Sequence, residues 1–241
     1  MSFSENRVGK AFEEELKKHE YLFFDKQGKS YSTRFKVYLN KHVPTHTQKF
    51  KQFWRAKNLN LRDIPPAQPE MDIIMVDKLN IWHAIELKAI KKTREGISPS
   101  YYLGLGQTLA YLSFGFNEVA LWQCFDGSTL TDDEIFRYDD ALSRIRAPLS
   151  HLVGKTCFRI LTDKEKLRIQ TSVWNSLTFE QVWIDGIGVF DSKKGRYIIR
   201  SVSDNPFLKP IKTQEGEYPF DPKVNAIRDF LEKQKAEVWD K

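Results

Sequence analysis

The sequence contains little cysteine and no long apolar run. Its 241 residues include only Cys124 and Cys157, too few for a disulfide framework, a four-cysteine zinc site or a four-cysteine iron–sulfur cluster. No stretch approaches the roughly 18–20 apolar residues that span a bilayer, and the first residues, MSFSE, contain no apolar signal core. These absences predict a protein that is neither secreted nor membrane-spanning, in a cytoplasmic or otherwise intracellular, reducing setting.

Acidic residues are missing from one long segment. Residues 26–62 contain ten Lys or Arg and no Asp or Glu, whereas the chain as a whole has 38 basic and 32 acidic residues. Such a stretch favours binding to a polyanion such as nucleic acid, because each neutralised phosphate releases condensed counterions. A solvated basic face is the alternative interpretation. The candidate phosphate contacts in this segment are Lys49, Lys51, Arg55 and Lys57.

Aromatic residues alternate with these basic residues. Phe50, Phe53 and Trp54 are spaced i, i+3 and i+4, which is more typical of the core stripe of a helix than of rings that stack on bases.

The rest of the chain reads as ordinary globular sequence, with 41% hydrophobic and 29% charged residues. Apolar spacing predicts a helix over residues 4–19, and two β-branched runs at 71–76 and 81–87 predict a hairpin. A buried helix over 101–114 and a strand over 119–125 should follow. This order predicts an α/β or α+β fold.

The C-terminal part gives weaker signals. Residues 131–146 have helical spacing, 182–202 read as β structure, and a final helix should open at Asp221 and Pro222, since proline suits the first helical position. We therefore predict a core over residues 1–150, with a basic insertion at about 26–62. Residues 151–241 would form a β-rich extension that ends in a helix and packs on the core.

The predicted hairpin carries the residues with chemical potential. Side chains alternate along a strand, so Glu86 and Lys88 must share one face while Ile85 and Leu87 take the other. If residue 77 pairs with residue 81, Asp72 lies opposite Glu86, with Cβ atoms about 5 Å apart. A four-residue loop would reverse that relation, so the register is a testable prediction.

Two carboxylates this close repel each other when both are ionised, and folded proteins relieve the repulsion with a cation or a proton. Oxygen ligands favour Mg²⁺ or Mn²⁺, and Mg²⁺ is often held by one or two carboxylates plus a substrate phosphate. Lys88, on the same face as Glu86, could orient or deprotonate a metal-bound water, or offset negative charge on the transition state. The alternative is a hairpin whose acidic and basic residues are incidental.

Four short motifs, two of them in the predicted hairpin, resemble those of a known nuclease superfamily. Asp72 followed by Glu86-Leu87-Lys88 resembles the D…(E/D)xK core of the PD-(D/E)XK nucleases, although the usual proline is displaced to Pro69. The Gly9…Glu13 spacing resembles the first helix of RecB-like nucleases and archaeal Holliday-junction resolvases, and Gln107…Tyr111 resembles the QxxxY motif of the RecB-like branch. The motifs span less than half of the chain.

The resemblance implies a restriction-endonuclease-like fold, with a mixed central sheet flanked by helices, and a metal-dependent DNA nuclease that uses metal-activated water. It implies Mg²⁺ (or Mn²⁺) held by Glu13, Asp72, Glu86 and the Leu87 carbonyl, with Lys88 tuning the nucleophile. Gln107 and Tyr111 would position the scissile backbone, and a homodimer is possible because related resolvases act as dimers. Apart from the resemblance, Lys91 and Lys92 closely follow the Glu-x-Lys strand and could contact phosphates, although a solvated loop would look the same.

Each of these assignments has an alternative. Glu13 lies among lysines and is equally typical of a solvated helix face, and Tyr111 is equally typical of a buried ring with a polar neighbour. At the level of function, the alternatives are a nucleic-acid-binding protein that keeps the fold without cleaving, or an RNA-directed nuclease.

Overall fold

The computed structural model describes most of the chain: residues 3–18, 21–24, 30–65, 70–76, 80–98, 104–149, 152–163, 166–171, 189–191, 196–200 and 222–234. Outside these residues lie Lys26 and Lys29 of the basic segment, the displaced motif proline Pro69, and most of the β structure predicted over 182–202.

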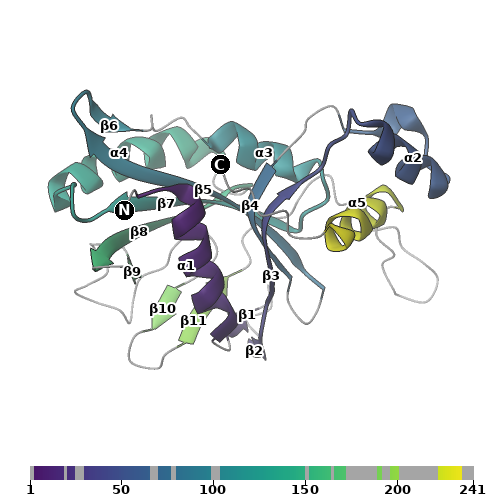
Figure 1. The fold of residues 1–241 in the computed structure, drawn as a ribbon. Coiled ribbons are helices and arrows are strands. Elements are labelled where there is room, and N and C mark those ends of the chain that lie inside the picture. The colour runs from purple at the N-terminus through teal and green to yellow at the C-terminus, as the bar shows by residue number, and fades with distance from the viewer. Residues whose placement is uncertain are drawn as a thin grey trace.

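Helices and strands alternate along the chain (Figure 1). The helices are α1 (Glu5–Lys18), α2 (Gln48–Ala56), α3 (Leu105–Leu112), α4 (Asp132–Arg146) and α5 (Pro222–Lys233), with single 3-10 turns η1 (Leu61–Asp63) and η2 (Ala147–Leu149). The strands are β1 (Tyr21–Phe24), β2 (Ser30–Thr33), β3 (Lys36–His42), β4 (Glu70–Val76), β5 (Trp82–Thr93), β6 (Gly96–Ser98), β7 (Glu118–Asp126), β8 (Gly154–Asp163), β9 (Lys166–Thr171), β10 (Val189–Asp191) and β11 (Arg196–Arg200).

The central sheet is mixed. Its strand order is β3-β4-β5-β7-β8-β9, with β6 paired to β5. The inner strands β5, β7 and β8 run parallel, and the pairs on either side are antiparallel. The predicted fold class, a mixed central sheet flanked by helices, is therefore confirmed.

The sheet crosses the domain boundary predicted near residue 150. Strand β8 pairs along seven residues with β7, so the first strands after that boundary belong to the core and not to an extension. A second sheet, of order β10-β11-β1-β2, likewise joins strands from the two ends of the chain. The boundary was misplaced because strand pairing between distant segments leaves no local signal.

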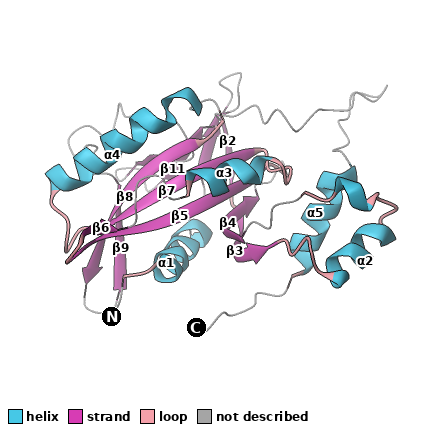
Figure 2. Ribbon diagram, turned by 90° about the horizontal axis from the view of Figure 1, so that it is seen from above, coloured by secondary structure: helices cyan, strands magenta, loops and turns pink. Residues whose placement is uncertain are grey.

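Helices cover both faces of the central sheet, with α1 on one face and α3 and α4 on the other (Figure 2). Val8, Phe12 and Leu16 of α1 are buried in one apolar cluster with Ile85 and Leu87 of β5. A second cluster on the opposite face includes residues of α2, α3 and α5 together with Trp82 and Leu121. The two clusters hold β5 and β7 between them.

The C-terminal helix α5 lies beside α2 (Figure 1). Its start at Pro222 is as predicted, and Val224, Ile227 and Leu231 are buried. The ring of Phe230 packs edge-on against Phe50 of α2, with centroids 4.9 Å apart. Thus α5 fixes α2 to the body of the protein.

Among the described residues, no helix combines the length and the apolarity that crossing a membrane requires.

Candidate active site

The β4–β5 pair has the predicted register. Ile73 pairs with Ile85, and the pairing continues through Val76 and Trp82. The same register sets Asp72 opposite Glu86, but the pairing stops at Ile73–Ile85. Beyond that pair, the Asp72 carboxylate is the hydrogen-bond acceptor for β5: its Oδ2 accepts a hydrogen bond from the Leu87 backbone N–H at 2.7 Å.

Side chains of β5 alternate as predicted. Ile85 and Leu87 lie in the apolar cluster beneath α1. Glu86 and Lys88 point to the other face, where Glu86 meets Tyr111 of α3. The prediction that a carboxylate and an amine project together from β5 is confirmed, since Lys88 Nζ lies 2.6 Å from Glu86 Oε1.

A further carboxylate comes from the first turn of α1. Glu5 Oε1 lies 3.4 Å from Lys88 Nζ, and 40% of the Glu5 side chain is exposed. The Glu86 and Lys88 side chains are only 1% and 8% exposed. We call Asp72, Glu86, Lys88 and Glu5 the acidic cluster; it combines three carboxylates with one ammonium and opens to solvent on the Glu5 side.

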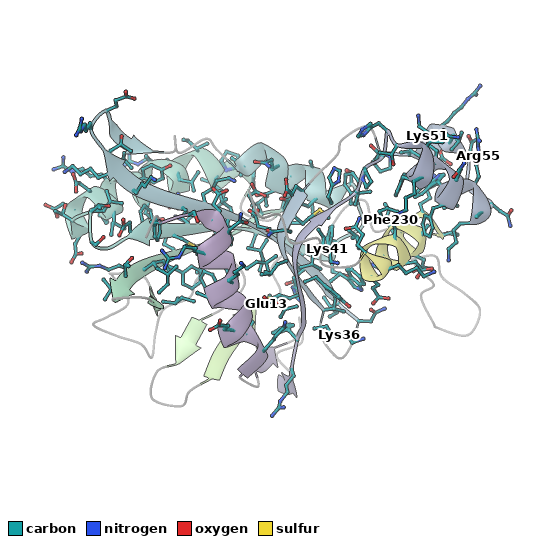
Figure 3. The ribbon with its side chains drawn as sticks, in the orientation of Figure 1. Glu13, Lys36, Lys41, Lys51, Arg55 and Phe230 are labelled. Carbon is teal, nitrogen blue, oxygen red and sulfur yellow. The ribbon has the colours of Figure 1, made fainter. Side chains whose placement is uncertain are left out.

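Glu13 forms its ion pair with Lys17, at 2.6 Å, and not with Lys88, so its role as a metal ligand stays a prediction. Figure 3 shows Glu13 in the lower half of α1, whereas the N-terminal end of the helix lies uppermost, beside β5. Glu5 precedes Glu13 by eight residues, about 12 Å along the helix axis. The α1 carboxylate that contacts Lys88 is therefore Glu5.

Tyr111 is fully buried, as in the alternative interpretation of a buried ring with a polar neighbour, and its role in positioning the scissile backbone stays a prediction. Its hydroxyl lies 2.7 Å from the Glu70 carbonyl oxygen and also contacts Glu86 Oε2. A phenol has one proton, so it donates to one of these acceptors at a time; a protonated Glu86 would instead donate to the phenol oxygen while the phenol donates to the Glu70 carbonyl. Gln107, one turn earlier, is exposed on α3.

Burial and mutual repulsion raise the pKa values of the two buried carboxyl groups. Burial, followed by the charge of Glu86, raises the pKa of Asp72 well above its ordinary value. Burial likewise raises the pKa of Glu86, against the opposing effects of Lys88 and Tyr111. For Lys88, burial lowers the pKa, but the neighbouring carboxylates, Glu86 first, raise it further, so the net shift is upward. Lys88 therefore stays an ammonium.

With every group ionised, the acidic cluster carries a formal charge of −2, the complement of a divalent cation. The Leu87 N–H points to β4, and a residue's C=O lies on the same strand edge as its N–H, so the Leu87 carbonyl faces the same gap. Among the described residues, no three His, Cys, Asp or Glu side chains already form a metal cage. Two carboxylates and a carbonyl nevertheless fit Mg²⁺, which keeps waters and completes its shell with substrate phosphate.

The predicted phosphate contacts on α2 divide by exposure. Lys49, Arg55 and Lys57 are exposed and Lys51 is half-buried, and Lys57 forms an ion pair with Asp229 of α5. Figure 3 shows Lys51 and Arg55 on α2, on the far side of the molecule from α1.

The aromatic residues of α2 turn inward. Phe50 and Trp54 are fully buried and Phe53 packs against Phe230, so the predicted core stripe is confirmed. The helix therefore presents cations outward.

Lys91 and Lys92 lie where β5 extends to pair with β6. Both are exposed, and Lys92 Nζ forms an ion pair with Glu134 of α4 at 2.5 Å.

Comparison with known protein families and with curated protein sequences gives no match for this chain. The chemistry of the acidic cluster is therefore argued from its own geometry.

Proposed function

We propose that this protein is a divalent-metal-dependent nuclease that hydrolyses phosphodiester bonds in DNA. The acidic cluster is the observation that carries the proposal: three carboxylates and a protonated lysine converge where β4 and β5 part. Such a cluster has surplus negative charge that a hard dication neutralises, and an ammonium placed to meet a phosphate.

Asp72, Glu86 and the Leu87 carbonyl are the candidate ligands of Mg²⁺ or Mn²⁺, with Glu5 beside them. When bound, the cation supplies Lewis acidity toward a phosphoryl oxygen and lowers the pKa of coordinated water.

Lys88 has a separate role in this proposal. Because its pKa is raised, Lys88 supplies a positive charge that stabilises the pentacovalent transition state, and it does not act as the base that removes a proton. Its ion pair with Glu86 fixes the ammonium at the mouth of the cluster.

The exposed cations of α2 and of the β5–β6 hairpin support the choice of nucleic acid as substrate. Contacts of lysine and arginine to phosphates position a strand without reading its sequence. On this proposal, α2 and the hairpin hold the backbone on either side of the cluster.

The test is cleavage of end-labelled single-stranded, duplex and branched DNA, with matched RNA substrates, in Mg²⁺, in Mn²⁺ and in EDTA. The wild type should cut DNA only with the metal, and Asp72→Asn and Lys88→Ala should bind DNA without cutting it. Binding without cleavage by the wild type on every substrate would instead favour the non-catalytic alternative, and preferential cutting of RNA would redirect the substrate.

A further inference from the structure

Gly104, the residue immediately before α3, lies directly on the side chain of Lys88. Gly104 is buried, and it precedes α3 with φ of 93°, a left-handed conformation that favours glycine. A Cβ built at this position would lie 3.0 Å from Lys88 Cε and 3.1 Å from Lys88 Cγ. The backbone at Gly104 therefore lies against the methylene groups of the Lys88 side chain.

The Gly104 backbone is held by hydrogen bonds to α3. The Gly104 carbonyl accepts hydrogen bonds from the Thr108 N–H at 2.8 Å and from the Thr108 hydroxyl at 2.7 Å, and Thr108 is fully buried. Both hydrogen bonds belong to the first turn of α3, so they fix the Gly104 backbone relative to that helix. Strand β7 is also close to Gly104, because the same Cβ would approach Leu121 Cδ1 to 2.8 Å.

We propose that Gly104 is a positioning residue for Lys88: the absence of a side chain at this position lets the lysine lie flat beneath α3, with its ammonium at Glu86 and Glu5. This inference rests on the proposed function only in its consequence for cleavage, because the placement of the lysine is measurable in the protein by itself.

The chain offers matched controls. Gly96 also has a left-handed φ, of 125°, yet no atom lies within 4 Å of a Cβ built there, so Gly96→Ala introduces comparable backbone strain without a contact. Gly106 lies within α3 with open space around it, so Gly106→Ala tests substitution in the same helix. Only Gly104→Ala combines strain with displacement of Lys88.

The first readout needs no activity. A buried, ion-paired lysine ammonium exchanges slowly with water, and its ¹⁵Nζ resonance is assigned by its loss in Lys88→Met. In metal-free protein, this resonance should shift or vanish in Gly104→Ala and stay in place in Gly96→Ala and Gly106→Ala. An unchanged Lys88 resonance in Gly104→Ala, or an equal change in Gly96→Ala, overturns the inference.

The second readout is steady-state cleavage. Gly104→Ala should lower kcat by up to about 10-fold and should change KM little, because the Lys88 stem must give by a few tenths of an ångström, and a misplacement of about 1 Å costs about 100-fold. A matched fall in Gly96→Ala, or a rise in KM with kcat intact, contradicts the positioning role. If the wild type cuts nothing but the resonance still moves in Gly104→Ala, the proposed function fails and the inference stands.

Folding of the variant is secured by a second change. Leu121→Val removes the methyl group nearest the new Cβ and leaves Lys88 as the remaining contact. Should Gly104→Ala fail to fold, the double variant Gly104→Ala/Leu121→Val takes its place in both measurements. Failure of both to fold, while Gly96→Ala folds, makes Gly104 a purely structural glycine and overturns the inference.

Discussion

Tyr111→Phe removes a single oxygen atom from the support of Glu86. The hydroxyl is fully buried, and its acceptors are Glu86 Oε2 and, at 2.7 Å, the Glu70 carbonyl oxygen. Phenylalanine keeps the ring and its edge contact with Phe116, whose centroid lies 6.3 Å away. The change therefore isolates the hydrogen bond from the packing.

The size of the effect depends on the charge of Glu86. A hydrogen bond to a neutral acceptor contributes about 0.5–1.5 kcal/mol to the free energy of unfolding, and one to a charged acceptor about 1.5–3 kcal/mol. The Tyr111 hydrogen bond lowers the pKa of Glu86, which means that it favours the ionised carboxylate. The loss of stability in Tyr111→Phe should therefore be small at acidic pH and increase as pH rises through the elevated pKa of Glu86.

Urea denaturation in EDTA at about pH 5 and pH 9 measures this difference without interference from bound cations. Gln107→Ala is the control, since Gln107 lies exposed one turn away on α3 and its loss should change stability by less than about 0.5 kcal/mol at either pH. A loss below about 0.5 kcal/mol in Tyr111→Phe at both pH values would refute the assignment of this hydroxyl to Glu86.

Four further outcomes are expected. In EDTA at pH 8, Asp72→Asn should raise the free energy of unfolding by about 1 kcal/mol, because it removes a buried charge. In Mg²⁺ the same variant should not cleave DNA. A carboxyl with a raised pKa loses its stabilising contribution as pH rises, so the gain should fade on acidification toward pH 4, and a variant less stable than wild type at pH 8 contradicts the argument. Thr131→Ala should cost about 1 kcal/mol, because it breaks the capping box with Glu134 at the start of α4. The Lys92 and Thr131 hydrogen bonds lower the pKa of Glu134 from its ordinary 4.5 to about 2, so its contribution is present above pH 4.5 and is lost as pH falls through about 2; acid titration of wild type and Glu134→Gln should converge there, and parallel curves would contradict it. Finally, Lys49→Ala/Arg55→Ala should reduce the slope of log K for DNA against log salt by about 2, whereas Lys17→Ala, on α1, should leave it unchanged; equal slopes for all three proteins would remove α2 from the interface.

Local patterns predicted the elements that carry the site. The alternation of side chains fixed the common face of Glu86 and Lys88, because a strand has a period of two whatever surrounds it. The hairpin register was predicted on the condition that residue 77 pairs with residue 81, and the observed pairing fits that condition; the start of α5 followed from Pro222. These features depend on neighbours in the chain, so the sequence specifies them directly.

The features that the sequence did not specify depend on how distant elements pack against each other. Glu5, Gly9 and Glu13 recur every four residues and share one face of α1, so helical periodicity cannot tell which carboxylate reaches β5. The answer depends on where α1 crosses the sheet: the Leu87 side chain lies 3.4 Å from a Cβ built at Gly9, which leaves Glu5 one turn toward Lys88. Acidic residues one turn on either side of a helix glycine should therefore be weighed equally.

The acidic cluster owes its existence to an interrupted strand pairing. The Leu87 N–H needs an acceptor, and in an unbroken ladder a β4 carbonyl would supply it. Because the Asp72 carboxylate supplies it at 2.7 Å, β4 and β5 separate beyond Ile73–Ile85 without leaving that donor unsatisfied. The separation gives Glu5 access to Lys88 from the α1 side, while α3 closes over Glu86 and Lys88 from the other. Asp72 therefore has two separable roles, and Asp72→Asn, which retains an oxygen acceptor for Leu87 but loses the charge, should keep this geometry while removing the affinity for a cation.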